Sequence, residues 1–134
     1  MTTFASTRLI TADIRRLVDF YALVTGIDPV WPAPVFAEIR TAHATLAIGA
    51  AETMAHFAGG TARPGENVCA IIEFRVEEVD REAARLEAAG LALVQAPTTM
   101  PWGNRSLLLR DPDGTLVNLF TPVTAEAIVR QEGR

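Results

Sequence analysis

Two carboxylates in predicted strands, Glu38 and Glu73, are the candidates of this sequence for acid–base chemistry. A carboxylate that is removed from water has a raised pKa, and this lets it act as a general base. An arginine stands two positions after each, at Arg40 and Arg75, and a solvated strand edge is an equally good interpretation of both pairs. The sequence leaves the two interpretations open and assigns no catalytic residue.

The histidines and the cysteine indicate little reactivity. His43 and His56 lack the helical or strand spacing that would place both imidazoles on one metal ion, and no His-x-Glu pattern accompanies them. A turn histidine and a surface histidine are the favoured interpretation. Cys69, the single cysteine, lies in an apolar stretch with no histidine nearby, which predicts a buried, unreactive thiol. The sequence contains no nucleophile elbow, P-loop or Rossmann glycine run.

The two tryptophans indicate binding of a planar organic ligand. Trp31 lies in the proline-rich, loop-like stretch IDPVWPAPVF, and Trp102 lies in the loop TTMPWGN. Large aromatic side chains on loops beside a cavity can stack on a flat ligand and bury its surface. For Trp31, a lid over the core or a dimer contact is an equal alternative. Arg105 would orient the ligand or simply pair with a carboxylate.

The elements that must position these residues occur twice along the chain. Residues 8–26 and 72–90 each predict a short strand, an acidic helix start, an amphipathic helix and a closing glycine, with Asp13 aligned to Glu78. Gly26 stands where a left-handed helix cap belongs. The apolar stripes of the two helices are Ile14, Leu17, Val18, Tyr21 and Val24, and Val79, Ala83 and Leu86.

The strands that follow each helix complete the same pattern, so each half is predicted to be βαβββ and the fold class α+β. After a proline-containing turn, the first half has strands at 35–41 and 44–50. The second has the segment 91–97, a loop at 98–104, and strands at 106–110 and 115–121. The single domain 1–134 thus divides into a module at 5–50, a linker at 51–67, a module at 68–122 and a helix at 124–132.

Strand alternation predicts which side chains line a cavity. Glu73 shares a face with Cys69, Ile71 and Arg75, and Asn118 shares a face with Leu116 and Phe120. In the strand 35–41, either Phe36, Glu38 and Arg40 or their apolar neighbours face the cavity. The polar set is the more natural lining.

Composition excludes several classes of partner. The net charge is −4 and no run of lysine or arginine is present, so a nucleic-acid partner is not expected. Charged residues interrupt the first seventeen residues, and no apolar run is long enough to span a bilayer, so neither a secretion signal nor a membrane partner is expected. A lone cysteine favours a cytoplasmic location.

The stretch VEEVD at the second helix and the stretch PWGNRSLLLRDPDGTLVNLF resemble the vicinal oxygen chelate superfamily over residues 7–122. This superfamily includes glyoxalase I, extradiol dioxygenases, fosfomycin-resistance enzymes and bleomycin-resistance binding proteins. The most specific piece is the turn 111–114, Asp-Pro-Asp-Gly, between two apolar strands. The resemblance implies cupped mixed sheets around a concave pocket, with helices on the convex side.

The resemblance also implies four inward positions that hold His or Glu in the metal-dependent members. They fall at Ser6, Ala47, Ile71 and Asn118 of this sequence. None of these residues supplies an imidazole, carboxylate or thiolate, the groups that bind zinc, iron or nickel. No metal and no other cofactor is therefore expected.

The predicted function is that of a metal-free small-molecule-binding protein of the bleomycin-resistance type, which sequesters a partly aromatic compound. The alternatives are a lyase- or dioxygenase-like enzyme with a non-standard or misaligned metal site, and a regulatory or structural protein. PWG at Trp102 resembles the bleomycin-resistance branch. The resemblance implies a homodimer, and the sequence does not decide whether the modules pair within a chain or swap between chains. The expected ligand-binding residues are Trp31, Phe36, Glu38, Glu73, Trp102, Arg105, Asn118 and Phe120.

Overall fold

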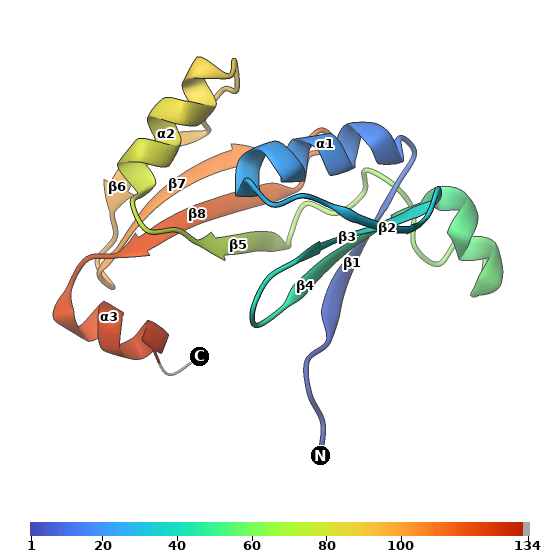
Figure 1. The fold of residues 1–134 in the computed structure, drawn as a ribbon, viewed down its shortest axis with the longest axis horizontal. Helices are drawn as coiled ribbons and strands as arrows, with labels where there is room; N and C mark the ends of the chain where they lie inside the picture. Colours follow the sequence, from blue (N-terminus) through green and yellow to red (C-terminus); the bar gives the residue numbers. More distant parts are fainter. Residues whose placement is uncertain (133–134) are drawn as a thin grey trace. The chain divides into compact units, whose positions relative to one another are not determined.

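A computed structural model describes residues 1–132 (Figure 1). The chain forms two compact units. The first comprises residues 1–67 and 111–114, and the second comprises residues 68–110 and the chain from Thr115 onward. Among the described residues, no helix has the length and apolar character needed to cross a membrane.

The first unit is a βαβββ module. Its strands form a mixed sheet in the order β1-β4-β3-β2, in which β1 and β4 are parallel and the other pairs antiparallel. Helix α1 begins after Asp13, whose side chain accepts a hydrogen bond from the backbone N–H of Arg16 at 3.1 Å, and ends at Gly26 with φ 69°. The elements are β1 (Ser6–Thr11), α1 (Ile14–Thr25), β2 (Val30–Ala33), β3 (Phe36–Arg40), β4 (Thr45–Ala50) and the 3₁₀ helix η1 (Ala51–His56).

The second unit repeats this connectivity, with a sheet in the order β5-β8-β7-β6. Its helix α2 begins after Glu78, the residue aligned with Asp13, so the repeat predicted from the sequence holds at the helix starts. The elements are β5 (Ile71–Arg75), α2 (Val79–Ala88), β6 (Gln95–Thr99), β7 (Asn104–Arg110), β8 (Leu116–Pro122) and α3 (Ala125–Glu132). The predicted α+β fold of two tandem βαβββ modules is confirmed.

Three local predictions were wrong. The stretch around Trp31 is strand β2, and β6 runs from Gln95 through Pro97 to Thr99, into the predicted loop. Both strands lie at a sheet edge, where proline is tolerated because its missing N–H faces no partner strand. Cys69 is exposed, because β5 begins only at Ile71 and the cysteine precedes it.

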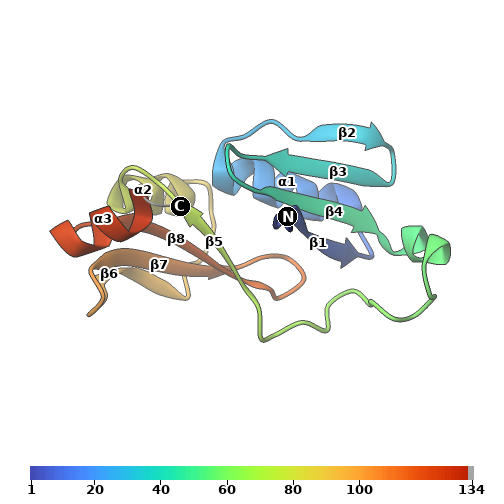
Figure 2. The ribbon, with the colours of Figure 1, turned by 90° about the horizontal axis from the view of Figure 1, so that it is seen from below.

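Each sheet has one face that its helix covers and one face that we call the open face. In the first unit, α1 lies against one face of the sheet (Figure 2). The residues that alternate with the open-face positions of β3 and β4 are buried: Ala37, Ile39, Leu46 and Ile48. The open face of the first sheet carries Ser6, Arg8, Ile10, Phe36, Glu38, Arg40, Thr45, Ala47 and Gly49. The open face of the second sheet carries Ile71, Glu73, Arg75, Ser106, Leu108, Leu116, Asn118 and Phe120.

The turn at residues 111–114 is fixed by the carboxylate of Asp111. One oxygen accepts the backbone N–H of Asp113 at 2.8 Å, and Gly114 completes the turn with φ 91°. The other oxygen accepts the hydroxyl of Tyr21, on α1, at 2.7 Å. Burial, and then the charge of Asp111, raise the pKa of Tyr21 far above its ordinary value. This contact attaches the turn to the first unit.

Candidate functional site

Glu73 and Asn118 lie directly opposite each other on the parallel strands β5 and β8. The amide Nδ2 of Asn118 donates a hydrogen bond to Oε2 of Glu73 at 2.8 Å. The amide oxygen Oδ1 is buried and has no hydrogen-bond partner among the described residues. A buried acceptor of this kind is costly unless a donor reaches it, so it is a candidate contact for a ligand N–H or O–H.

Apolar and cationic groups surround this pair. Phe120 is 8% exposed and stands opposite Arg75, and Leu108 stands opposite Asn118 on β7. Arg75 is exposed and forms no hydrogen bond or ion pair with the residues of the described chain. At the ends of β5 and β8 a hollow of about 650 Å³ opens, lined by Arg75, Val76, Glu77, Thr121, Pro122 and Ile128.

The open face of the first sheet carries a second group of predicted residues. Glu38 is half-buried, and its Oε1 accepts the Arg40 guanidinium at 2.7 Å. Phe36 lies two positions earlier on the same strand, and the guanidinium of Arg8 lies over its ring at 4.9 Å from the centroid. The polar set of this strand therefore faces away from α1, as the alternation argument favoured.

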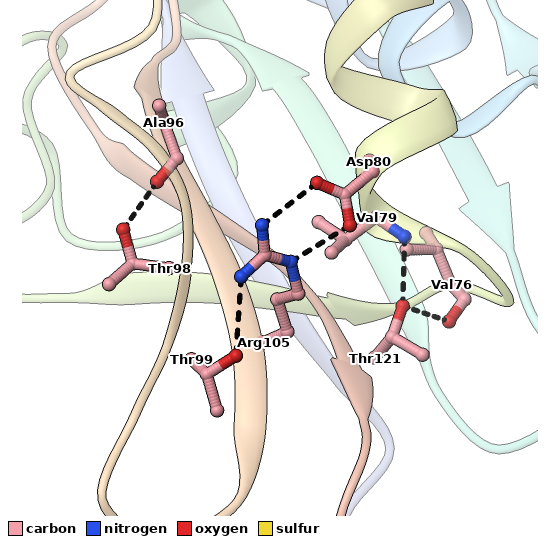
Figure 3. Close-up of polar contacts among 8 residues, drawn as sticks. All are labelled: Val76, Val79, Asp80, Ala96, Thr98, Thr99, Arg105 and Thr121. Atoms are coloured by element: carbon pink, nitrogen blue, oxygen red, sulfur yellow. Dashed lines mark hydrogen bonds and ion pairs between the residues drawn. The ribbon is translucent and has the colours of Figure 1, made fainter.

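Two predicted residues lie on the helix-covered side instead. Arg15, on α1, lies over the ring of Trp31 at 4.9 Å, so this indole packs on the side that α1 covers. Arg105 pairs with Asp80 of α2 at 2.8 and 3.0 Å and donates to Thr99 (Figure 3). The sequence had allowed either a ligand or a carboxylate for Arg105, and the structure gives it a carboxylate. Hydrogen bonding between the two lowers the pKa of Asp80 and raises that of Arg105.

Thr121 forms a further contact between the second sheet and α2, on the side of the sheet that α2 covers. Its hydroxyl accepts the backbone N–H of Val79 at 3.0 Å and donates to the carbonyl of Val76 at 2.9 Å, which joins β8 to the start of α2 (Figure 3). Arg105 stands opposite Thr121 in the β7–β8 register. The Arg105 side chain is thus part of the attachment of α2 and lies on the other side of the sheet from Asn118.

Trp102 lies in the loop between β6 and β7 and is 57% exposed. Its carbonyl oxygen accepts the guanidinium of Arg130, on α3, at 2.7 Å. The next residue, Gly103, has φ 92°, and a Cβ there would collide with the Thr124 hydroxyl. The loop backbone is therefore held against α3 while the indole stays accessible.

Sequence reasoning missed Arg8 and Phe57. The guanidinium of Arg8 lies 5.6 Å from the centroid of the Phe57 ring, in addition to its contact with Phe36. Alternation could have found Arg8, because it stands two positions after Ser6 on β1 and opposite Ala47. No sequence signal places Phe57, which follows η1 in the linker.

Comparison with known proteins places the chain in a family. Residues 3–119 match the Glyoxalase/Bleomycin resistance protein/Dioxygenase superfamily. The chain belongs to this superfamily. The comparison with curated proteins gave no match.

Solved structures of the superfamily share the fold. A glyoxalase/bleomycin resistance protein/dioxygenase from Nocardioides superposes with a TM-score of 0.75 at 22% identity, over 93% of this chain and 86% of that chain. A family enzyme from Burkholderia phytofirmans PsJN gives 0.77 at 20% identity, over 91% and 100%. A lactoylglutathione lyase from Agrobacterium tumefaciens gives 0.70 at 21% identity, over 90% and 94%. At these identities the likeness shows the fold alone.

The residues at the four positions that the resemblance to the superfamily implies for a metal do not fit a metal ion. Ala47 and Ile71 carry no donor atom, and the Asn118 amide donates to Glu73. A hydroxyl at Ser6 and a neutral amide are weak ligands for zinc, nickel or iron. Within residues 1–132, no group of three or more His, Cys, Asp or Glu side chains is arranged to hold a metal.

Proposed function

We propose that this superfamily member is a metal-free small-molecule-binding protein of the bleomycin-resistance type, which sequesters a partly aromatic compound. The observation that carries the proposal is the hydrogen bond from the Asn118 amide to Glu73. The amide N–H supplies a hydrogen-bond donor to the carboxylate without a cation between the two side chains. A metal ion at this point would compete with the Asn118 amide for the carboxylate, and it would need further charged ligands that the neighbouring Ile71 cannot supply.

The chemistry of the two open faces supports binding of an organic ligand. Phe36 and Phe120 offer aromatic surface, and Glu38, Glu73 and Asn118 offer hydrogen-bonding groups. Ligand sites combine mainly apolar walls with a few polar groups that fix orientation. We propose that Glu73, Asn118 and Phe120 contact a ligand on the second sheet, together with the exposed indole of Trp102. We propose that Phe36 and Glu38 contact a ligand on the first sheet. Trp31 and Arg105 contribute by holding α1 and α2 to their sheets.

We further propose a homodimer in a reducing, cytoplasmic setting. β1 and β5 are each at the edge of their sheet, where unpaired backbone groups need cover. Ile71 on β5 is 50% exposed and Val68, shortly before it, is 81% exposed. A second copy of the chain would bury these apolar groups. The acidic balance of the chain argues against nucleic acid as a partner.

The test combines elemental analysis with a ligand screen. Purified protein is expected to hold far less than one zinc, nickel, iron or manganese per chain and to bind some aromatic compounds, detected by a change in tryptophan fluorescence. Substitution Asn118→Ala should weaken the binding of those compounds, because it removes the buried amide oxygen that we propose accepts a hydrogen bond from the ligand. About one metal per chain, released by a change at Asn118 or Glu73, would instead favour the enzyme alternative.

A further inference from the structure

We propose that Arg8 forms a carboxylate-binding site on the open face of the first sheet. Its guanidinium lies 4.9 Å from the centroid of the Phe36 ring and 5.6 Å from that of Phe57. Both distances are within the range of cation–π attraction. Within residues 1–132 this guanidinium has no hydrogen bond or ion pair. Its charge is held in place by aromatic rings, while its five N–H donors stay available.

The backbone is built to bring these three side chains together. Arg8 is on β1 and Phe36 on β3, so the Arg8 stem must cross β4 to reach the ring. It crosses at Gly49, where an added Cβ would lie 3.9 Å from Cδ of Arg8 and 3.1 Å from Oγ1 of Thr53. The missing side chain at Gly49 therefore lets η1 approach the strand, and the residue after η1 is Phe57.

The neighbouring charges determine which ligand suits Arg8. Glu38, on the same row of the sheet, is already paired with Arg40 at 2.7 Å, so it does not neutralise Arg8. The planar guanidinium fork matches the two oxygens of a carboxylate. A phosphate dianion would call for a second free cation, and Arg40 is occupied. The surrounding Phe36, Phe57 and Ile10 favour a carboxylate carried on an apolar, aromatic body.

This inference rests on the proposed function, because it assigns the carboxylate to the sequestered compound. It restricts that compound to organic monoanions. Because the rings already limit the motion of the Arg8 side chain, less conformational entropy is lost when a ligand binds. A fixed cation with an aromatic surround thereby selects carboxylates over neutral molecules of the same shape.

The test is a titration followed by two-dimensional NMR, with benzoate, its neutral analogue benzamide, and inorganic phosphate as probes. Benzoate is expected to bind at least about tenfold more tightly than benzamide or phosphate and to shift the Nε–Hε signal of Arg8. Substitution Arg8→Met keeps an apolar side chain without the charge. It should weaken the binding of benzoate about tenfold and leave the binding of benzamide unchanged. Arg8→Lys keeps a positive charge without the planar guanidinium, and its affinity for benzoate should lie between those of the unchanged protein and of Arg8→Met.

Arg15→Met is the matched control, because Arg15 also lies over an aromatic ring at 4.9 Å, but on the side that α1 covers. It should leave benzoate binding unchanged. Equal binding of benzoate and benzamide, tighter binding of phosphate, or no benzoate binding at all would overturn the proposal, even if Arg8→Met did not fold. Binding of neutral aromatic compounds that ignores Arg8 would leave the proposed function standing and remove only the carboxylate. If the protein held stoichiometric metal and also bound benzoate through Arg8, the metal-free function would be wrong and the carboxylate site would stand.

Discussion

Substitution of Tyr21 by phenylalanine tests how the Asp-Pro-Asp-Gly turn is attached to the first unit. The change removes one hydroxyl, which donates to Oδ2 of Asp111 at 2.7 Å. Both side chains are almost fully buried, at 0% and 4% exposed. A hydrogen bond to a charged acceptor contributes about 1.5–3 kcal/mol. Because the carboxylate oxygen stays buried when this donor is lost, we expect the free energy of unfolding to fall by about 2 kcal/mol.

The measurement is urea unfolding followed by tryptophan fluorescence, at one fixed protein concentration because a dimer would make stability depend on concentration. For a chain of this size a loss of about 2 kcal/mol lowers Tm by roughly 5–8 °C. A double-mutant cycle with Asp111→Asn then separates the coupling between the two side chains from their other contacts.

Alkaline titration provides a second readout, because Tyr21 is the only tyrosine. Its folded-state pKa is raised above the ordinary value of 10.0, chiefly by burial. Above pH 10 the unfolded chain loses this proton while the folded chain keeps it, so folded protein binds more protons and stability falls as pH rises. Below pH 10 the contribution is fully present. The folded protein should show no tyrosinate absorbance at pH 11, and Tyr21→Phe should flatten the alkaline loss of stability.

Two results would refute this reasoning. A loss of less than about 0.5 kcal/mol in Tyr21→Phe would mean that the hydroxyl contributes no more than an ordinary surface contact. Tyrosinate absorbance that rises near pH 10 in protein still folded by tryptophan fluorescence would mean that the hydroxyl is accessible to water. Either outcome would mean that contacts other than the Tyr21–Asp111 hydrogen bond hold the turn in place.

Three further predictions concern the loop at Trp102 and the assembly. Trp102→Ala should weaken the binding of an aromatic ligand by about 2 kcal/mol. Because the indole is exposed, the change should cost far less stability than the roughly 3–5 kcal/mol lost with a core tryptophan. Titration calorimetry and Tm measure the two effects, and unchanged affinity with a collapsed Tm contradicts the prediction. Gly103→Ala should lower Tm by several degrees, because φ is 92° and the new Cβ meets Thr124; an unchanged Tm argues against the close packing. Light scattering should give twice the 14.5 kDa chain mass, and a mass of one chain excludes the dimer.

Much of the fold followed from the sequence because the signals are local and repeated. The stripe through Leu17, Tyr21 and Val24 is buried as predicted, and Asp13 and Gly26 begin and end the helix. Pattern alone could not place β2 and β6, because their prolines are equally compatible with a loop and with the edge of a sheet. Edge strands are paired on one side only, so their ends depend on the neighbouring strand rather than on their own residues.

The candidate site was less predictable, because it depends on which partner each charged side chain finds. Alternation correctly put Glu73 and Asn118 on one face, since the period of a strand fixes that relation. It could not show that Arg105 pairs with Asp80, or that the Arg8 guanidinium lies over aromatic rings and has no ion pair within residues 1–132. Those contacts depend on the helix and the linker that pack on each sheet. The Arg105 guanidinium pairs with Asp80 on the side of the sheet that α2 covers, so it does not face a ligand on the open face. Arg8, whose guanidinium has no ion pair among the described residues, is therefore a better candidate for ligand recognition than Arg105, the arginine that the sequence motif indicated.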